Sequence, residues 1–273
     1  MLGVNNTRAV RDRELNPTEI ERMRLLLSTF RDGSGQRVKN VDGSMPDYLG
    51  FERVTAIVLG GTTNESKHIF DVVAPGGPDR LPWGVSCKMA SEASAKSNCW
   101  FMELSNSAKY LTAAIENRGV DWRTSPEKAG PILVGTVKSW HEAVRREFDV
   151  DASKYLLLTH DKAWREFQII SFGMDIVHAV DPAAIDWRVE GKNAEEGDPS
   201  SVAGYIDTDS GPLRLWQWYA RSGGQLKFYP PKGWEEWSSV RFELEVAPVH
   251  DLQAKAEEYW PNLWGELDRA RPE

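Results

Sequence analysis

The stretch that decides the fold runs from Ile69 to Glu103. Its three apolar segments are IFDVV at residues 69–73, GVSCKM at residues 84–89 and WFME at residues 100–103. Short apolar segments, the first two separated by a Pro/Gly loop, are typical of buried strands. Because successive side chains alternate along a strand, Ser86 and Lys88 point to one face, where they meet Asp71 of the preceding strand. The sequence therefore predicts a carboxylate beside a lysine within a sheet.

This pairing has a chemical consequence. A lysine in such a position can hold a water or a phosphate, while Asp71 and a second carboxylate can hold a divalent cation, which prefers oxygen ligands and bridges to phosphate. The alternative is that Asp71 is a turn residue and Lys88 a solvated strand charge. A strand as apolar as residues 85–89 disfavours this alternative, because a central strand seldom carries an unpaired lysine. The pattern indicates nuclease chemistry.

The same residues resemble the core of the PD-(D/E)XK nucleases. Within that group the pattern is similar to the type II restriction endonucleases in which Ser-x-Lys replaces Glu-x-Lys, and in which the missing carboxylate comes from a helix start further along the chain. The resemblance covers about the first half of the chain and implies four catalytic residues, Asp71, Ser86, Lys88 and Glu103. Glu103 stands at the matching position, and the resemblance implies that Asp71 and Glu103 hold Mg²⁺.

Other acids are candidates for supporting roles. The helix–strand–strand order of residues 47–89 resembles the start of the nuclease core, whose first helix often carries an accessory acid. Glu65 and Glu52 are the candidates here, and Glu65 is preferred. Glu92 lies nearer to Lys88 than Glu103 does, and it can replace Glu103 as the second carboxylate if the intervening segment is helical.

Helices and strands alternate through the first part of the chain. Asn16, Pro17 and Glu19 predict a capping box that opens a helix ending at Gly33. A second helix is predicted at about 47–59, and a third, which contains Leu111, ends at Gly119. The remaining predictions are a buried strand at 132–134, a helix at 139–148 and a buried strand at 155–159. This alternation implies an α/β fold with a mixed central sheet flanked by helices, as in restriction endonucleases.

The second part of the chain is richer in predicted strands. Strands are expected at 167–172, 213–219, 225–229 and 241–246, followed by a final helix at about 252–271. The acidic segment 190–201 is expected to be a surface loop. We therefore expect N-terminal helices plus a catalytic core in residues 1–160, and a β-rich DNA-recognition half with a C-terminal helix in residues 161–273, integrated into one domain.

A second constellation lies in the predicted hairpin of residues 213–229. Its Gly-Gly turn would present Arg221, Ser222, Gln225 and Lys227 together, a set suited to reading base edges in the major groove. The alternative is a hairpin with a merely hydrated tip. Trp216, Trp218 and Trp234 lie close by in sequence and could contact DNA.

The composition is that of a globular protein. The 273 residues are 41% hydrophobic and carry a net charge of −8. This charge counts against nonspecific nucleic-acid binding, which depends on phosphate neutralisation, but a metal-dependent nuclease needs acids at its centre and only a local basic lining. Cys87 and Cys99 match neither a disulfide framework nor a zinc site, which favours a reducing cytoplasm. We expect no membrane partner, because no apolar run approaches bilayer length and the N-terminus lacks a signal-peptide pattern.

Together these features predict a Mg²⁺-dependent type II restriction endonuclease that hydrolyses phosphodiester bonds at a specific site in double-stranded DNA. A symmetric cut of both strands requires two centres, so a homodimer is expected, with a cognate DNA methyltransferase as genetic partner. Two alternatives remain open. One is a DNA-repair or structure-specific nuclease with the same core, and the other is a non-catalytic DNA-binding protein.

Overall fold

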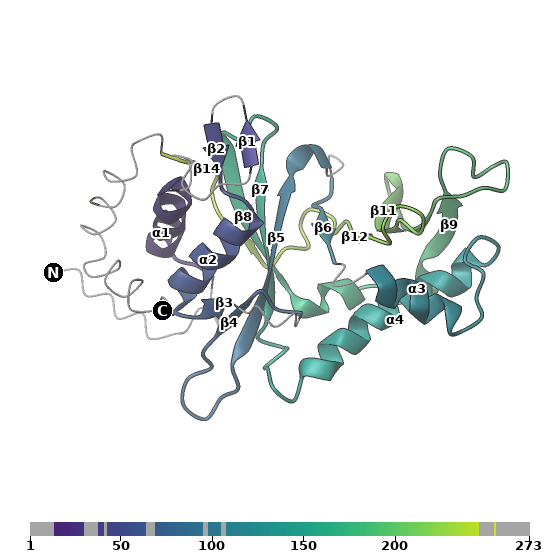
Figure 1. Ribbon diagram of the computed structural model, residues 1–273, viewed down its shortest axis with the longest axis horizontal. Coiled ribbons are helices and arrows are strands. Elements are labelled where there is room, and N and C mark those ends of the chain that lie inside the picture. The colour runs from purple at the N-terminus through teal and green to yellow at the C-terminus, as the bar shows by residue number, and fades with distance from the viewer. Residues whose placement is uncertain are drawn as a thin grey trace.

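The computed structural model describes residues 14–29, 38–40, 43–63, 69–94, 98–104, 108–245 and 254. A seven-stranded mixed sheet and a five-stranded antiparallel sheet lie side by side, with helices packed on their faces (Figure 1). A separate two-stranded ribbon consists of β1 (Val38–Asn40) and β2 (Gly43–Met45). The predicted α/β fold with a mixed central sheet is confirmed.

Helix α1 (Pro17–Ser28) begins with the predicted capping box. The Asn16 side chain accepts a hydrogen bond from the Glu19 amide at 2.9 Å, and the Glu19 carboxylate accepts one from the Asn16 amide at 2.8 Å. The helix ends at Ser28, before the expected Gly33, which lies outside the described residues. Its last turn is closed by the Ser28 hydroxyl, which donates to the Arg24 carbonyl at 2.6 Å.

Helix α2 (Tyr48–Leu59) has both of its predicted ends. Asp47 caps the N-terminus by accepting a hydrogen bond from the Gly50 amide at 2.8 Å, and Gly60 ends the helix in the left-handed region with φ 65°. Glycine suits this position because it has no Cβ to clash there. Helices α1 and α2 bury their apolar sides, which include Phe51, against one face of the larger sheet.

The larger sheet has the order β13-β8-β7-β5-β4-β3, with β14 also paired to β8. Its strands are β3 (Thr62–Thr63), β4 (Val72–Ala74), β5 (Trp83–Ser91), β7 (Lys154–His160), β8 (Glu166–Gly173), β13 (Trp237–Ser238) and β14 (Phe242–Glu243). The predicted strand around Lys88 is confirmed as β5, which runs antiparallel to β4 and parallel to β7. The strand expected from residue 69 begins only at Val72, so Asp71 is the residue just before it.

Helix α4 (Pro126–Val144) corrects one prediction. Residues 132–134 are not a strand, and the helix expected at 139–148 is the second part of α4. A short apolar run cannot distinguish a buried strand from a buried helix by itself. Leu133, Val134 and Val137 are buried at helical spacing against the face of the larger sheet opposite to α1 and α2. The larger sheet is therefore covered by helices on both faces.

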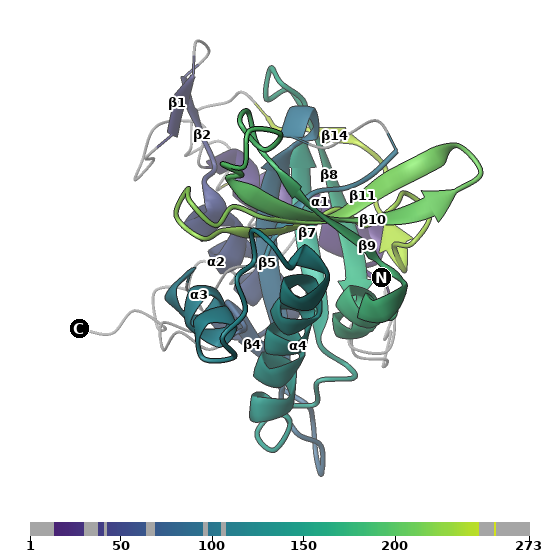
Figure 2. The same ribbon diagram turned by 90° about the vertical axis from the view of Figure 1, so that its right-hand side faces the viewer.

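The smaller sheet has the order β6-β12-β11-β10-β9, and Figure 2 shows it in front of the larger sheet. Its strands are β6 (Met102–Glu103), β9 (Asp186–Glu190), β10 (Ser201–Thr208), β11 (Gly211–Trp218) and β12 (Leu226–Phe228). Helices α3 (Ala108–Glu116) and α4 pack with the side chains of its inner face in one core cluster. The expectation that Trp216 and Trp218 contact DNA is wrong, because each is 1% exposed in that cluster. Trp234 packs against the same cluster.

The connecting segments and the division of the chain into two halves differ from the prediction. The acidic loop is shorter than predicted, because Glu190 ends β9 and Ser201 begins β10. Short 3-10 helices stand at Glu92–Ser94, Met174–His178 and Pro182–Ala184. Both sheets draw strands from both sides of residue 160, so the expected halves are interwoven.

The final helix expected at 252–271 lies outside the described residues, apart from residue 254. Among the helices that the structure describes, none is long and apolar enough to cross a membrane.

Candidate active site

Asp71 lies at the centre of the larger sheet, where β4 begins beside the middle of β5. Its amide donates to the Val85 carbonyl at 3.0 Å, which fixes the backbone. Its Oδ2 atom accepts a hydrogen bond from the Cys87 amide at 2.7 Å and lies 3.4 Å from Ser86 Oγ. Lys88 Nζ lies 3.6 Å from the same oxygen. The structure thus brings together Asp71, Ser86 and Lys88, as the sequence predicts, and we call these residues with Glu52 the Asp71 centre.

The centre is partly open to solvent. The side chains of Asp71 and Lys88 are 30% and 19% exposed, whereas Ser86 is buried. Within the part of the chain that the structure describes, every hydrogen bond and ion pair to the Asp71 carboxylate involves Oδ2. Among the described residues, none forms a hydrogen bond or ion pair with the other oxygen, Oδ1.

Glu52, on α2, is the acid that the structure places beside this pair. Burial and the negative charge of Asp71 raise the pKa of Glu52 to about 7, while the charge of Lys88 opposes the shift. Two carboxylates that repel each other in this way form a place where a cation would be stabilised. Glu65, the preferred accessory acid from the sequence, lies outside the described residues.

The centre fits a Mg²⁺ ion of the kind that acts on phosphate. Mg²⁺ usually keeps several waters and takes only one or two carboxylates, with phosphate oxygens completing its octahedral shell. Asp71 and Glu52 are two such carboxylates, close enough for the charge of Asp71 to raise the pKa of Glu52. Among the described residues no group of three or more His, Cys, Asp or Glu side chains could hold a metal.

Glu103 lies on a different element from the one expected. The resemblance implies a helix start at this position, but Glu103 is on strand β6, opposite Lys227 of β12, and α3 begins only at Ala108. Across the described residues no hydrogen bond or ion pair joins Glu103 to Asp71 or Lys88. Its role as a metal ligand stays a prediction.

Glu92, the alternative second carboxylate, follows directly after β5. It forms an ion pair with Arg241, whose Nη2 atom lies 2.6 Å from Glu92 Oε1. The segment that begins at Glu92 is a 3-10 helix and not an α-helix. The structure therefore gives Glu92 a partner of its own beyond the end of the strand.

The hairpin of β11 and β12 forms as predicted, with Gly223 and Gly224 at positive φ. Its polar residues do not form one free cluster. Arg221 is in an ion pair with Asp198, and Lys227 lies on β12 with its ammonium group 4.6 Å from the Tyr219 ring centre and 5.1 Å from that of Phe101. Ser222 and Gln225 are exposed.

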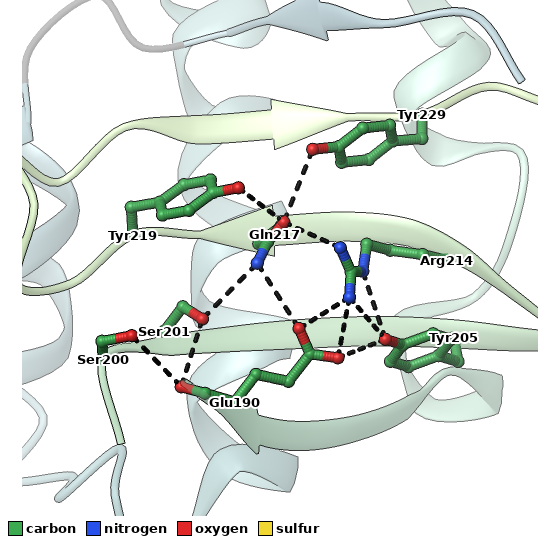
Figure 3. Close-up of polar contacts among 8 residues, drawn as sticks. All are labelled: Glu190, Ser200, Ser201, Tyr205, Arg214, Gln217, Tyr219 and Tyr229. Carbon is green, nitrogen blue, oxygen red and sulfur yellow. Dashed lines mark hydrogen bonds and ion pairs between the residues drawn. The ribbon is translucent and has the colours of Figure 1, made fainter. Parts of the chain in front are cut away.

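A polar network on the outer face of the smaller sheet was not predicted (Figure 3). Arg214 Nη2 contacts both carboxylate oxygens of Glu190, at 2.7 and 2.9 Å. Arg214 Nη1 and the Tyr219 hydroxyl donate to Gln217 Oε1, at 3.1 and 2.8 Å. The sequence signal is the placement of Arg214 and Gln217 within an otherwise apolar strand. Such a satisfied network fixes the geometry of the sheet.

His141 and His160 contact neighbouring aromatic side chains. His141 Nε2 lies 3.0 Å from the Tyr155 hydroxyl, and the His160 ring stacks on Trp164 with ring centres 3.7 Å apart. Cys87 and Cys99 are buried thiols. The contact between His141 and Tyr155 could not be predicted from the sequence, because it depends on how α4 packs on β7.

Comparisons of the chain with protein-family models, with curated proteins and with solved structures found no match. Evidence for function therefore has to come from the chemistry of the residues themselves. The Asp71 centre is the place where carboxylates and a lysine converge on a partly open surface.

Proposed function

We propose that this protein is a Mg²⁺-dependent endonuclease that cleaves double-stranded DNA, of the type II restriction endonuclease kind with a PD-(D/E)XK core. One observation carries the proposal. Lys88 Nζ lies 3.6 Å from the Asp71 carboxylate, which the Cys87 amide holds in place, and Glu52 is a second acid within electrostatic reach of both. The arrangement of elements supports it, since a helix (α2), the strand after Asp71 (β4) and the Ser-x-Lys strand (β5) occur in the order of the resemblance.

Each residue of the centre has a role in this reaction. Asp71 and Glu52 would hold the metal, with Glu103 as the ligand implied by the resemblance. When bound, Mg²⁺ supplies Lewis acidity toward the phosphate and its attacking water. Lys88 would orient that water and stabilise the negative charge that grows on the phosphate. Ser86 occupies the position of the replaced acid and keeps the strand surface beside Asp71 small and polar.

Site-specific cleavage and a homodimer are the finer parts of the proposal. A structure-specific or repair nuclease with the same core is the second candidate, and the ion pair between Arg221 and Asp198 favours it. An arginine that already binds a carboxylate must leave that partner before it can read a base edge. A methyltransferase as genetic partner belongs to the first candidate only.

The test is cleavage of supercoiled plasmid and genomic DNA with Mg²⁺ or with EDTA. We expect cutting only with Mg²⁺, and we expect Lys88→Ala to lose cleavage by several orders of magnitude while it still binds DNA, because Lys88 acts on the transition state. Lys154→Ala is the matched control. Lys154 lies on the adjacent strand β7, is 22% exposed and also pairs with a carboxylate, that of Glu236 at 2.7 Å.

The products separate the candidates. Discrete fragments whose ends share one sequence indicate a restriction enzyme, whereas cutting confined to branched, nicked or damaged DNA indicates a structure-specific nuclease. DNA binding without any cleavage indicates the non-catalytic alternative. Near-normal cutting by Lys88→Ala would remove Lys88 from the mechanism.

A further inference from the structure

A small, partly open cavity adjoins the Asp71 centre and shares Ser86 and Lys88 with it. Its volume is about 10 Å³, roughly the space of one water, and its polar lining comes from Ser86, Lys88, Tyr155 and His141. The rest of the lining is apolar and includes Trp140 of α4. Lys88 therefore contacts Asp71 and also lines a cavity that contains the side chains of Tyr155 and His141.

The strand register explains how Tyr155 reaches this cavity. In the parallel pair of β5 and β7, Ser86 is paired with Tyr155 and Lys88 with Leu157. Paired residues of neighbouring strands point to the same face of the sheet, so Tyr155 stands directly beside Ser86 and diagonally to Lys88. Tyr155 is 4% exposed.

His141 of α4 holds the Tyr155 hydroxyl from the other side. Its Nε2 atom lies 3.0 Å from the Tyr155 oxygen, and the imidazole is 4% exposed. Burial, together with the neighbouring His178, lowers the pKa of His141 to about 4, so the ring is neutral at neutral pH. In a neutral imidazole Nε2 accepts in one tautomer and donates in the other, and a hydroxyl can answer either role, so the ring can hold the Tyr155 oxygen in both cases.

Tyr155 itself remains protonated. Burial and the negative charge of Asp71 raise the pKa of the Tyr155 hydroxyl. The influence of Asp71 also shows that this hydroxyl lies within electrostatic reach of the centre. The cavity thus contains a neutral dipole that is anchored at one end and that cannot neutralise the charge of Lys88.

We propose that Tyr155, oriented by His141, is a positioning residue that holds the Lys88 ammonium group at the Asp71 centre. A lysine side chain is a flexible four-carbon stem, and its separation of 3.6 Å from Asp71 Oδ2 leaves the ammonium group freedom to move. A fixed hydroxyl on the buried side restricts that freedom. The role in cleavage rests on the proposed function, whereas the restraint on Lys88 does not.

The first test measures Lys88 without any need for activity. The intact protein is labelled with a trace of acetic anhydride, and the acetylation rate of Lys88 is measured by mass spectrometry relative to Lys154 in the same molecule. We expect Tyr155→Phe and His141→Leu to raise the relative rate severalfold, because the amine is released toward solvent. Tyr229→Phe is the matched control, since it removes another buried tyrosine hydroxyl, one that lies 3.4 Å from Gln217.

The second test measures cleavage. We expect Tyr155→Phe to lower kcat by about 10²-fold with an unchanged KM for DNA, as for a displaced catalytic group. His141→Gln, which keeps a polar partner for the hydroxyl, should recover most of the rate that His141→Leu loses. Because His141 acts through Tyr155, the double variant Tyr155→Phe/His141→Leu should cut no more slowly than Tyr155→Phe alone.

The labelling and cleavage results test the inference and the proposed function separately. An unchanged Lys88 labelling rate in folded Tyr155→Phe overturns the inference, and so does additive loss in the double variant. If Tyr155→Phe does not fold, the labelling rates of His141→Leu and His141→Gln make the same decision. A wild-type protein that never cleaves DNA would refute the proposed function, while the labelling rates would still decide whether Tyr155 restrains Lys88.

Discussion

At the scale of single residues, the negative charge that the proposed function requires of Glu52 lowers the stability of the fold. The partly buried Glu52 carboxyl group, on α2 and under the influence of Asp71, holds its proton up to a pH of about 7. Ionisation therefore costs folding free energy, and a bound cation would recover it. This is the balance expected where a protein gives up stability to keep a binding site.

The pH dependence of stability should reveal this cost. The pKa of Glu52 is raised from 4.5 to about 7 in the folded protein, so the unfolded chain loses this proton at lower pH than the folded one. The stability that Glu52 contributes is thus fully present below pH 4.5 and is lost as the pH rises through 7. Relative to wild type, Glu52→Gln should gain about 1 kcal/mol across this window, allowing for solvent screening. Urea unfolding at several pH values measures it, and a pH-independent difference would contradict it.

The second carboxylate can be identified by metal binding alone. Above pH 7, Mg²⁺ should raise the Tm of the wild-type protein, because a ligand that binds only the folded state stabilises it. We expect Glu52→Gln to abolish most of this rise. If Glu103→Gln abolishes it and Glu52→Gln does not, the metal lies nearer β6 than the structure indicates. Thermal scans with Mg²⁺ and with EDTA on the three proteins provide the comparison.

At the scale of elements, α4 joins the two sheets through a close contact at Gly130. A Cβ atom added at Gly130 would lie 1.9 Å from Cδ2 of Trp187, whereas one added at Gly135 of the same helix meets nothing within 4 Å. The glycine at 130 is therefore required by packing, and the one at 135 is not.

This contrast gives a matched pair of variants. Gly130→Ala should destabilise the protein by about 1–3 kcal/mol, because the indole of Trp187 must move. Gly135→Ala should stabilise it by about 1 kcal/mol, because alanine is the better helix former at an open site. Denaturant unfolding measures both. Equal effects of the two changes would show that α4 does not pack on β9 as described.

The sequence predicted those elements whose signals are local. The capping box at Asn16, the stop at Gly60 and the apolar strand around Lys88 each follow from a few adjacent residues. The strand predicted at 132–134 is wrong, because three consecutive apolar residues are too few to show the periodicity that distinguishes a strand from a helix. The influence of Asp71 on Glu52 could not be predicted from the sequence, because it comes from the packing of α2 on the sheet and not from distance along the chain.

At the scale of the whole molecule, one core cluster spans both sheets. Tyr155 and Leu157 of the larger sheet belong to the same cluster as Trp216 and Phe228 of the smaller one. The polar network of the smaller sheet was also beyond prediction, since Glu190 and Arg214 meet only when β9 and β11 flank β10.

A shared core should make unfolding cooperative. We expect a single transition in urea, with the same midpoint by far-UV circular dichroism and by tryptophan fluorescence, because Trp83 and Trp216 report on different sheets of one unit. Two separated midpoints would show that the smaller sheet melts independently. The Gly130→Ala variant is the most sensitive test of this cooperativity, since it weakens the contact of α4 with Trp187 in the smaller sheet.

The pairing of β6 with β12 has a consequence for synthesis. Met102 and Glu103 are made early, but their partners Lys227 and Phe228 follow only after α3, α4 and five further strands. At about 5–20 residues per second, the ribosome leaves this edge without its partner for on the order of ten seconds. During that interval the nascent chain exposes the unpaired edge of β6, and release of the chain before β12 is made would leave this strand edge open to aggregation.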